Sequence, residues 1–597
     1  MAAFLRIRKC FFKPPQLNNL ISVNSKASPT SFSILVMSSS SGTGMASMST
    51  TARRRSAHAA PQPPDWNNDS SLFAYTRGRF VFDEARQIRQ RTVRFDMNRL
   101  AQIAASSIGA DHCITVTKCP DGMHTKAYIL RMDDGREVIA KVPNPNAGVP
   151  HYTTASEVAT IDFMRDVLQT PAPTVHAWSS RADDNSVGAE YIVMEKAVGE
   201  PLERFWDRMS ASEKLKVLMQ VLSYYKSWLA FSFPAYGSLY YKSDGGPSSL
   251  AVHIPGGGPP SERFAIGPAT GRDWYDAGRS SLKCDCGPWT SALAYCTAIA
   301  ARERAAVQRL PPARQMLLIT GPSPELYTPT PAKKLSALAA LDPLLPRVLL
   351  TGNPLLVAPR LWHDDLHGEN IFVDPSDPTR ITAVIDWQGC QVSPLFDHNA
   401  VRPIFLEYSF ESATASENDA AADKDGDDTA PPPAAPDTSG MSGSDRAAAL
   451  KAYVDTAICI AWRRLVRDAA PALHDLEKFQ DSTEGSVLQV ARRVYEYGES
   501  LLAGMVLDLE PSLKDRDDVD ETVIRSEMDA ESKGIGLMAQ MQEQMGDDWP
   551  DNGVTVAGDY DKVKATLTQA RDDLAEVMYG EDEAKKEEFR NDWPFNN

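Results

Sequence analysis

The sequence predicts an α+β protein with two lobes, a small one rich in β-strands and a large one that is mostly helical. Between residues 113 and 194, β-prone runs and one helical stretch follow in the order strand, strand, strand, helix, strand. Helical periodicity dominates from Leu202 onward. The 597 residues, 43% of them hydrophobic, are enough for more than one lobe.

The small lobe is expected to span about residues 75–197. From Asn98 to Ile108 apolar residues recur at helical spacing, and a second helix is expected at Thr154–Leu168, where two prolines follow. The expected strands are apolar or alternating runs bounded by turn residues. They are Cys113–Lys118, Ala127–Met132, Glu137–Val142 and Tyr191–Met194.

The large lobe is expected to occupy residues 198–410 and to resume after an insertion. Leu202–Phe231 has helical periodicity, whereas residues from about 237 to 288 are rich in Gly, Pro and aromatics and indicate an ordered but irregular segment. Residues 411–446 contain almost no large apolar side chain, so they cannot offset their ordering entropy and are predicted to be a disordered insertion. Helical periodicity returns over 447–597.

Composition excludes several classes of protein. The formal charge of −17 argues against non-specific binding to a nucleic-acid backbone, which needs clustered cations. There is no run of about 18 uninterrupted apolar residues, so no membrane-spanning helix is expected. Eight cysteines in so long a chain do not form a disulfide framework. The pair Cys284 and Cys286 lacks the second pair that a zinc site would need, which favours reduced thiols.

Residues 1–64 are predicted to be a mitochondrial transit peptide and linker. This stretch contains no Asp or Glu but holds eight Lys and Arg residues, and it is rich in Ser. Its first turns place Phe4, Leu5 and Ile7 among cations, as in a basic amphipathic helix. A basic tail without a targeting role is the other interpretation. The predicted location is therefore mitochondrial.

The segment LWHDDLHGENIFVD carries the chemistry that phosphoryl transfer needs. Such a reaction needs a carboxylate near the acceptor hydroxyl, oxygen ligands for Mg²⁺ and a cation on the donor phosphates. Asp365 and Asn370 are five residues apart on one loop, in the pattern H-x-D-x-x-x-x-N. A second apolar run, Thr382–Ile385, ends in Asp386, which a hairpin would turn back toward the loop. The other interpretation is a surface loop with coincidental acids.

This segment, with ITAVIDWQG, resembles the aminoglycoside phosphotransferase and choline kinase-like superfamily, a branch of the protein-kinase-like fold. Further stretches resemble fungal mitochondrial proteins named for altered inheritance of mitochondria (member nine). They are DGREVIAKVPNP, TASEVATIDFMR, RFAIGPATGRDWY, CGPW and DWPF. The resemblance implies a two-lobed protein-kinase-like fold that uses ATP and Mg²⁺.

The resemblance also implies roles for single residues. Lys141 would hold the donor phosphates, and Glu157 on the following helix would pair with it and fix the ammonium group, unless the two form an ordinary surface pair. Asp365 would be the catalytic carboxylate, and Asn370 and Asp386 would hold Mg²⁺.

Supporting residues follow from the same resemblance. His363 would support the catalytic loop by hydrogen bonding, and Asp397 would anchor that loop from below, unless it is a helix N-cap. Glu195 and Lys196 would lie at the hinge where an adenine edge meets backbone, although Glu195 could simply be exposed. His367 is expected to be a packed loop histidine.

One loop departs from the family pattern. Kinases of this type place several glycines between the first two strands so that backbone amides can approach the phosphates. Here Gly122 is the single glycine between Pro120 and Lys126. His124 and Lys126 could contact phosphate, whereas Asp121 would repel it. The loop is expected to be stiffer than usual.

Two functions remain open from the sequence. The first is a mitochondrial ATP- and Mg²⁺-dependent phosphotransferase that acts on the hydroxyl of an unknown small molecule. The second is a nucleotide-binding pseudoenzyme that acts as a mitochondrial scaffold or regulator. The retained Asp365, Asn370 and Asp386 favour the enzyme, and the glycine-poor loop favours the pseudoenzyme. The acceptor and the oligomeric state are not indicated.

Overall fold

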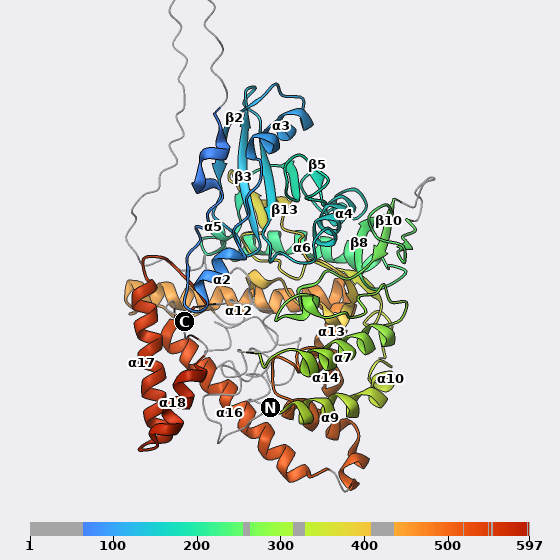
Figure 1. Cartoon of the computed structure of the whole chain (residues 1–597), viewed down its shortest axis with the longest axis vertical. Coiled ribbons are helices and arrows are strands. Elements are labelled where there is room, and N and C mark those ends of the chain that lie inside the picture. Colours follow the sequence, from blue (N-terminus) through green and yellow to red (C-terminus); the bar gives the residue numbers. More distant parts are fainter. Residues whose placement is uncertain are drawn as a thin grey trace, which may run out of the picture.

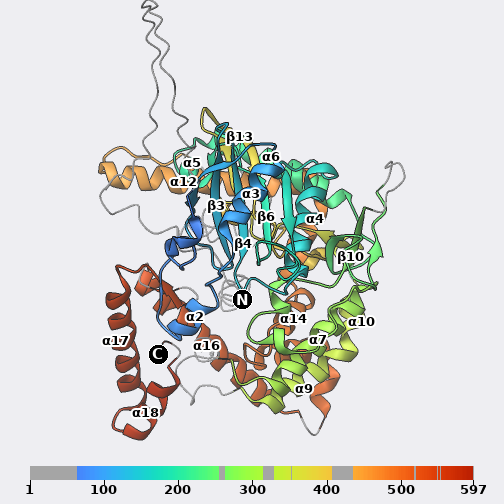
Figure 2. The same cartoon turned by 45° about the horizontal axis from the view of Figure 1, so that its top comes forward.

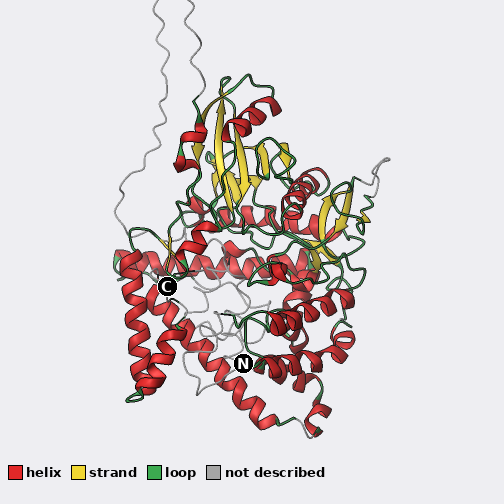
Figure 3. Cartoon of the chain, viewed as in Figure 1, coloured by secondary structure: helices red, strands yellow, loops and turns green. Residues whose placement is uncertain are grey.

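The computed structural model describes residues 64–254, 263–313, 329–350, 352–406, 435–516, 519–546, 549–550, 553–593 and 595. The predicted α+β class is confirmed, because a small lobe built on a β-sheet sits against a large lobe that is mostly helical (Figures 1 and 3). The predicted leader lies outside the described residues apart from Pro64.

The small lobe is built on a five-stranded antiparallel sheet with the strand order β2-β3-β4-β6-β5. Its strands are β2 (Cys113–Lys118), β3 (Thr125–Met132), β4 (Glu137–Pro143), β5 (Val175–Ser179) and β6 (Tyr191–Glu195). One face packs its apolar side chains against α3 (Met97–Ser107). Helix α4 (Tyr152–Asp166) connects β4 to the rest of the sheet and is buried along most of its length.

Strand β5 is absent from the sequence prediction. Its residues, Val-His-Ala-Trp-Ser, alternate weakly and follow two prolines, which indicate a loop. The strand forms at the edge of the sheet because β6 offers its backbone as a template, so tertiary pairing overrides a weak local preference.

A lead-in segment runs along the small lobe before α3. It consists of η1 (Trp66–Asn68), η2 (Ser70–Leu72), β1 (Arg79–Phe80) and α2 (Glu84–Arg89). Tyr128 donates a 2.7 Å hydrogen bond to the Leu72 carbonyl, and Lys126 reaches the Ala74 carbonyl at 3.1 Å. These buried donors hold the segment against the sheet.

The large lobe surrounds one continuous apolar core. Its helices are α5 (Glu203–Trp206), α6 (Ala211–Ala230), α7 (Ala292–Arg309), α9 (Pro331–Leu341), α10 (Leu345–Val348), α12 (Gly443–Ala469), α13 (Pro471–Asp481), α14 (Thr483–Ala491) and α15 (Ser500–Leu509), with short turns η5 (Asp342–Leu344), η6 (Leu395–Asp397) and η7 (Pro511–Asp515). Short strands frame residues 362–370, which we call the catalytic loop after the role that the sequence predicts for it. The strands are β7 (Glu200–Pro201), β11 (Pro359–Leu361), β12 (Ile371–Asp374), β13 (Asp377–Val384) and β14 (Val392–Pro394). In the order β13-β12-β7, strand β12 pairs with β7, so the loop lies beside the point where the chain passes from the small lobe into the large lobe.

The segment from 237 to 288 is more regular than predicted. It contains a three-stranded sheet of order β8-β10-β9, followed by the turns η3 (Arg272–Trp274) and η4 (Arg279–Ser281). The strands β8 (Ser238–Tyr241), β9 (Leu250–Ala251) and β10 (Phe264–Gly267) are too short for a clear alternating pattern. The sheet packs on α4, whose apolar face supplies the order that the strand sequences lack.

The chain returns to the small lobe after α15, through the strand Val554–Thr555. Helix α12 begins at Gly443, inside the segment predicted as a disordered insertion, and residues 411–434 of that segment lie outside the described residues. Beyond α15 come α16 (Glu521–Met545), β15 (Val554–Thr555), α17 (Tyr560–Tyr579) and α18 (Glu583–Asp592). Strand β15 pairs with β1, so the C-terminal helices lie beside α2 (Figures 1 and 2).

Two expectations from composition can be compared with the structure. In the described part of the chain, no helix combines the length and the apolar character needed to cross a bilayer. The described cysteines are all free thiols.

Candidate functional site

The catalytic loop connects β11 to β12 and is closed by its own hydrogen bonds. The Asn370 side-chain amide donates to the Asp365 carbonyl at 3.0 Å and lies 3.1 Å from His367 Nε2. The side chain of Asp365 is 42% exposed, so its carboxylate faces solvent from the loop. Because the amide nitrogen of Asn370 is used within the loop, its oxygen is the atom left for a ligand.

His363 joins this loop to the hairpin β12–β13. Burial lowers the pKa of His363, so the imidazole is neutral near pH 7, and its Nε2 donates to the Ile385 carbonyl at 2.9 Å. Its ring also meets the edge of Trp387 with centroids 4.6 Å apart. His363 thus holds the backbone that carries the next residue, Asp386.

Asp386 follows β13 and turns back to the loop. The Ile385 amide donates to the Asn370 carbonyl at 2.9 Å, which places Asp386 next to Asn370. Asp386 has a φ of 63°, a left-handed conformation that costs a non-glycine residue energy and is held only by surrounding contacts. Burial would raise the pKa of the Asp386 carboxyl, but the Lys141 ammonium outweighs burial and lowers the pKa.

Lys141 on β4 bridges the two lobes. Its Nζ lies 2.6 Å from Glu157 Oε1 on α4 and 2.7 Å from Asp386 Oδ1 in the large lobe. Burial alone would lower the pKa of Lys141, but the two carboxylates outweigh it and raise the pKa. Burial raises the pKa of Glu157. The lysine therefore stays charged, and it ties the sheet to Asp386, which lies next to Asn370 of the catalytic loop.

The donor set fits a hard divalent cation. Among the described residues, neither Asn370 Oδ1 nor the second carboxylate oxygen of Asp386 accepts a hydrogen bond, and Mg²⁺ prefers oxygen ligands completed by phosphates and water.

The face of the sheet that bears Lys141 is apolar and partly open. Directly opposed residues of an antiparallel sheet share one face, and Lys141 opposes Ala127 and Ile192. Two positions along β4, Ile139 opposes Ile129 and Met194. The other face carries Tyr128 and Ala140, which are fully buried against α3 and its neighbours. Ala127, Ile129, Ile139 and Met194 are half-buried and form a flat apolar surface beside the lysine.

The loop between β2 and β3 differs from the prediction. Asp121 does not face a ligand, because it is buried in ion pairs with Lys118 at 2.7 Å and Lys126 at 3.0 Å. Lys126 is fully buried in the same pairs, so it is not available to phosphate. Gly122 closes the turn with its amide on the Thr125 carbonyl at 3.1 Å. The predicted phosphate contact of Lys126 and the predicted repulsion by Asp121 are therefore wrong.

The hinge after β6 is partly occupied. The Glu195 amide donates to the Thr174 carbonyl at 2.8 Å, and the Glu195 carboxylate accepts from the Thr174 amide at 3.2 Å. Lys196 pairs with Glu137 at 2.6 Å on the exposed side of the sheet. Neither side chain turns toward the catalytic loop, so a ligand contact at this hinge would have to use other backbone groups.

The anchor of the catalytic loop is His398 and not the predicted Asp397. Asp397 binds Arg492 and the Tyr295 hydroxyl, within the core of the large lobe. His398 Nδ1 lies 3.0 Å from Asp364, the residue before Asp365, and the Asn399 amide donates to Asp364 at 2.9 Å. Burial lowers the pKa of His398, but the Asp364 carboxylate outweighs it and the pKa is raised.

Comparison with known proteins bears on this site directly. Residues 273–397, which include the catalytic loop and Asp386, match the model of the phosphotransferase enzyme family. This part of the chain is similar to that family.

Curated relatives extend the match. A subtelomeric hrmA-associated cluster protein of Aspergillus fumigatus is 36% identical over 317 residues, which cover 48% of this chain and 59% of that protein. Altered inheritance of mitochondria protein 9, mitochondrial, of Yarrowia lipolytica is 26% identical over 357 residues, covering 55% of this chain and 59% of the relative. The chain thus spans about three fifths of the length of these relatives.

Solved structures give a weaker likeness. A thermostable mutant of aminoglycoside phosphotransferase APH(4)-Ia in its apo form aligns with a TM-score of 0.32 at 14% identity, covering 72% of this chain and 98% of that chain. A putative fructosamine-3-kinase from Thermobifida fusca aligns with a TM-score of 0.32 at 13% identity, covering 70% and 99%.

Outside the residues that match this family model, the lead-in segment contributes residues that the sequence did not indicate. Arg77 donates from Nη1 to the Asp121 carbonyl at 3.4 Å, and Tyr75 places its hydroxyl 3.7 Å from Met123 Sδ. Arg91 lies behind the same loop, with its guanidinium 4.6 Å from the Phe80 ring centroid. A sequence signal exists only in the density of arginines between residues 77 and 94.

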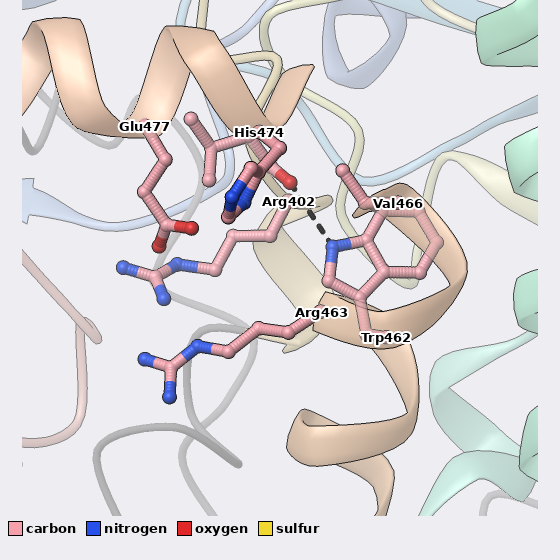
Figure 4. Close-up of a pocket in the computed structure, with 7 residues that line it drawn as sticks. Arg402, Trp462, Arg463, Val466, His474 and Glu477 are labelled. Carbon is pink, nitrogen blue, oxygen red and sulfur yellow. Dashed lines mark hydrogen bonds between the residues drawn. The ribbon is translucent and has the colours of Figure 1, made fainter. Parts of the chain in front are cut away.

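A shallow pocket on the large lobe is separate from this site (Figure 4). It lies between α12 and α13, and Trp462 in its wall donates to the Val401 carbonyl at 3.0 Å. Its lining residues are Val401, Arg402, Trp462, Arg463, Val466, His474 and Glu477. None of them is a predicted site residue.

Proposed function

We propose that the chain is an ATP- and Mg²⁺-dependent phosphotransferase that acts on the hydroxyl of a small molecule. The observation that carries this proposal is Lys141, which binds Glu157 and Asp386 at once at 2.6 and 2.7 Å. A lysine held between the sheet and a carboxylate beside Asn370 positions donor phosphates and metal over the catalytic loop.

The apolar surface of Ala127, Ile129, Ile139 and Met194 supports nucleotide binding. It lies on the Lys141 face of the sheet, so an adenine ring on this surface would direct its phosphates toward Lys141. Mg²⁺, held by Asn370 and Asp386, would neutralise charge on the transferred phosphoryl group.

Asp365 would orient the acceptor. Its exposed carboxylate accepts the proton of the acceptor hydroxyl while that oxygen forms a bond to the terminal phosphorus and the bond to the ADP oxygen breaks. The Asn370 amide bonds to the Asp365 carbonyl, so the distance between the proton acceptor and the metal ligand is fixed by the loop itself.

The test is transfer from labelled ATP. The purified chain is incubated with ATP labelled on the terminal phosphate and a mitochondrial metabolite extract, beside an Asp365→Asn control. A labelled small molecule formed by the parent and missing with the control supports the proposal. Equal labelling by both proteins contradicts it.

A nucleotide-binding pseudoenzyme is the second candidate, and one observation favours it. The β2–β3 loop has a single glycine, and Met123 at its tip is buried in a cluster with Phe80 and Val554, so backbone amides have little freedom to follow phosphates. Full rescue of a strain lacking the protein by Asp365→Asn at normal abundance would select this candidate.

We further propose a mitochondrial location. It rests on the acid-free, cation-bearing residues 1–64 and on the relatives whose names call them mitochondrial. Residues 1–64 fused to a fluorescent reporter should direct it to mitochondria. A reporter that stays diffuse in the cytosol contradicts the proposal.

A further inference from the structure

Two arginines of the lead-in segment lie beside the β2–β3 loop without a carboxylate partner. Arg91 is 6% exposed, and its Nη1 donates only to the Gln87 side chain at 2.7 Å and the Gln87 carbonyl at 3.1 Å. Among the described residues, neither Arg91 Nε nor the buried Arg77 Nη2 has a hydrogen-bond partner. In the part of the chain that the structure describes, no ion pair involves either residue.

Both guanidinium groups carry an energetic cost in this state. Burial lowers the pKa of Arg77 and of Arg91, which shows that each charge loses hydration. An arginine stays protonated even so, and a buried charge without a counter-ion is strongly unfavourable. Two such charges next to one loop indicate that an anion completes the arrangement.

The two arginines belong to one cluster with Tyr75 and His124. The charges of Arg91 and Arg77 both act on the Tyr75 hydroxyl, which touches Met123 in the loop. His124 follows Met123, and both of its ring nitrogens are buried. Among the described residues neither nitrogen has a partner in good hydrogen-bond geometry, although the Asn146 backbone lies close enough to raise the pKa of the ring. Burial, Arg272 and Arg91 lower the pKa of His124 well below its usual value, so the ring is neutral and can donate one hydrogen bond.

The carboxylates nearby are committed elsewhere. Asp121 is held by Lys118 and Lys126, and Asp276 accepts from Nε and Nη2 of Arg272. Glu369 lies within the field of Arg77, but it shares a hydrogen bond with the neighbouring Glu203 carboxyl. The cluster therefore keeps an excess of positive charge.

We propose that Arg77, Arg91 and His124 bind the terminal phosphates of the nucleotide donor. This inference rests on the proposed function. Lys141 already shares its charge with Asp386 and Glu157, and Lys126 is buried in ion pairs, so the loop itself supplies little positive charge to a triphosphate. The planar guanidinium groups supply paired donors that match phosphate oxygens. Cations from upstream of the sheet thus replace the amides of a glycine-rich loop.

The test measures binding of a nucleotide series to the full chain by calorimetry with Mg²⁺ present. The variants are Arg77→Gln, Arg91→Met and their combination. The matched control is Arg136→Gln, which removes an exposed arginine of the same lobe that pairs with Asp134. ATP affinity should fall about 10-fold in each single variant, as expected for one charge-assisted contact, and further in the combination. Adenosine affinity and the control should match the parent.

Thermal melting of the ligand-free proteins separates a ligand-binding role from a structural one. Replacing an unpaired buried arginine by an apolar side chain removes its desolvation cost, so Arg91→Met should melt no lower than the parent. ATP should raise the melting temperature of the parent more than that of the variant.

Three results would overturn the inference. One is equal loss of ATP and adenosine affinity, and another is unchanged ATP affinity in the combined variant. The third is a ligand-free Arg91→Met that melts clearly lower, which would make the arginine structural. A parent chain that binds no nucleotide would overturn the proposed function as well, and this outcome is distinct because it appears before any variant is made.

Discussion

The catalytic loop and the β2–β3 loop face the same site but are built in different ways. The catalytic loop satisfies its own polar groups, since Asn370, His363 and Asp364 bind backbone or side chains within the large lobe. The β2–β3 loop instead relies on Arg77, Phe80 and Val554 from distant parts of the chain. The catalytic loop should therefore keep its conformation when distant elements are lost, whereas the β2–β3 loop should depend on all of its distant contacts.

The largest expected effect concerns the chemistry of the catalytic loop. Asp365→Asn keeps the shape of the side chain but removes the charge that we propose accepts a proton. It should lower kcat by about 10²–10⁴ while ATP affinity and melting temperature match the parent. Steady-state kinetics and calorimetry on one preparation check this, and a parallel loss of ATP affinity would mean that Asp365 acts in binding.

The next effect concerns the link between the two lobes. Lys141→Met leaves the buried Glu157 without its cation, and unfolding in urea should show a loss of about 3–5 kcal/mol at pH 7. Adding Glu157→Gln should recover much of this loss. The loss should also shrink as pH falls, because the pKa of Glu157, already raised by burial, lets that carboxyl take up a proton in the folded protein.

A smaller effect concerns the β2–β3 loop. Val554 is 1% exposed and packs with Phe80 and Met123, whereas Val556 on the same segment is 49% exposed. Val554→Asp should cost about 2–3 kcal/mol and weaken ATP binding, because it detaches the cluster that holds the loop. Val556→Asp is the control and should change neither quantity. Normal ATP affinity in Val554→Asp would show that the loop does not need the C-terminal strand.

The smallest effect concerns the anchor of the catalytic loop. Asp364 raises the pKa of His398, so the pair stabilises the fold fully below the usual histidine pKa, and this stabilisation is lost as pH rises through the raised value. His398→Gln should remove this pH dependence and cost less than about 1 kcal/mol at pH 6, since Asp364 is partly exposed. Melting curves across pH 5–9 of parent and variant check it. Identical slopes would contradict the assignment.

The difference between local and distant contacts also explains which site residues could be predicted from the sequence. The spacing of Asp365, Asn370 and Asp386 is local, so the sequence indicated their neighbourhood, and the structure places them together with Lys141 and Glu157. Arg77 and Arg91 could not be found in this way, because they come close to the β2–β3 loop only when the lead-in segment folds against it. The exchange of Asp397 for His398 as anchor has the same origin. Adjacent polar residues after a proline cannot be told apart until the turn η6 directs one into the core and the other to the loop.

The pairing of β1 with β15 has a consequence for how the molecule assembles. Arg79 faces Thr555 across the ribbon, so nearly the whole described chain must be synthesised before this contact can close. Contacts of such sequence separation form late, since the entropy of closing so large a loop must be overcome first. The catalytic loop can therefore fold on a nascent chain in which the β2–β3 loop still lacks its support from β15. Only a chain synthesised past β15 has both halves of the proposed site in place.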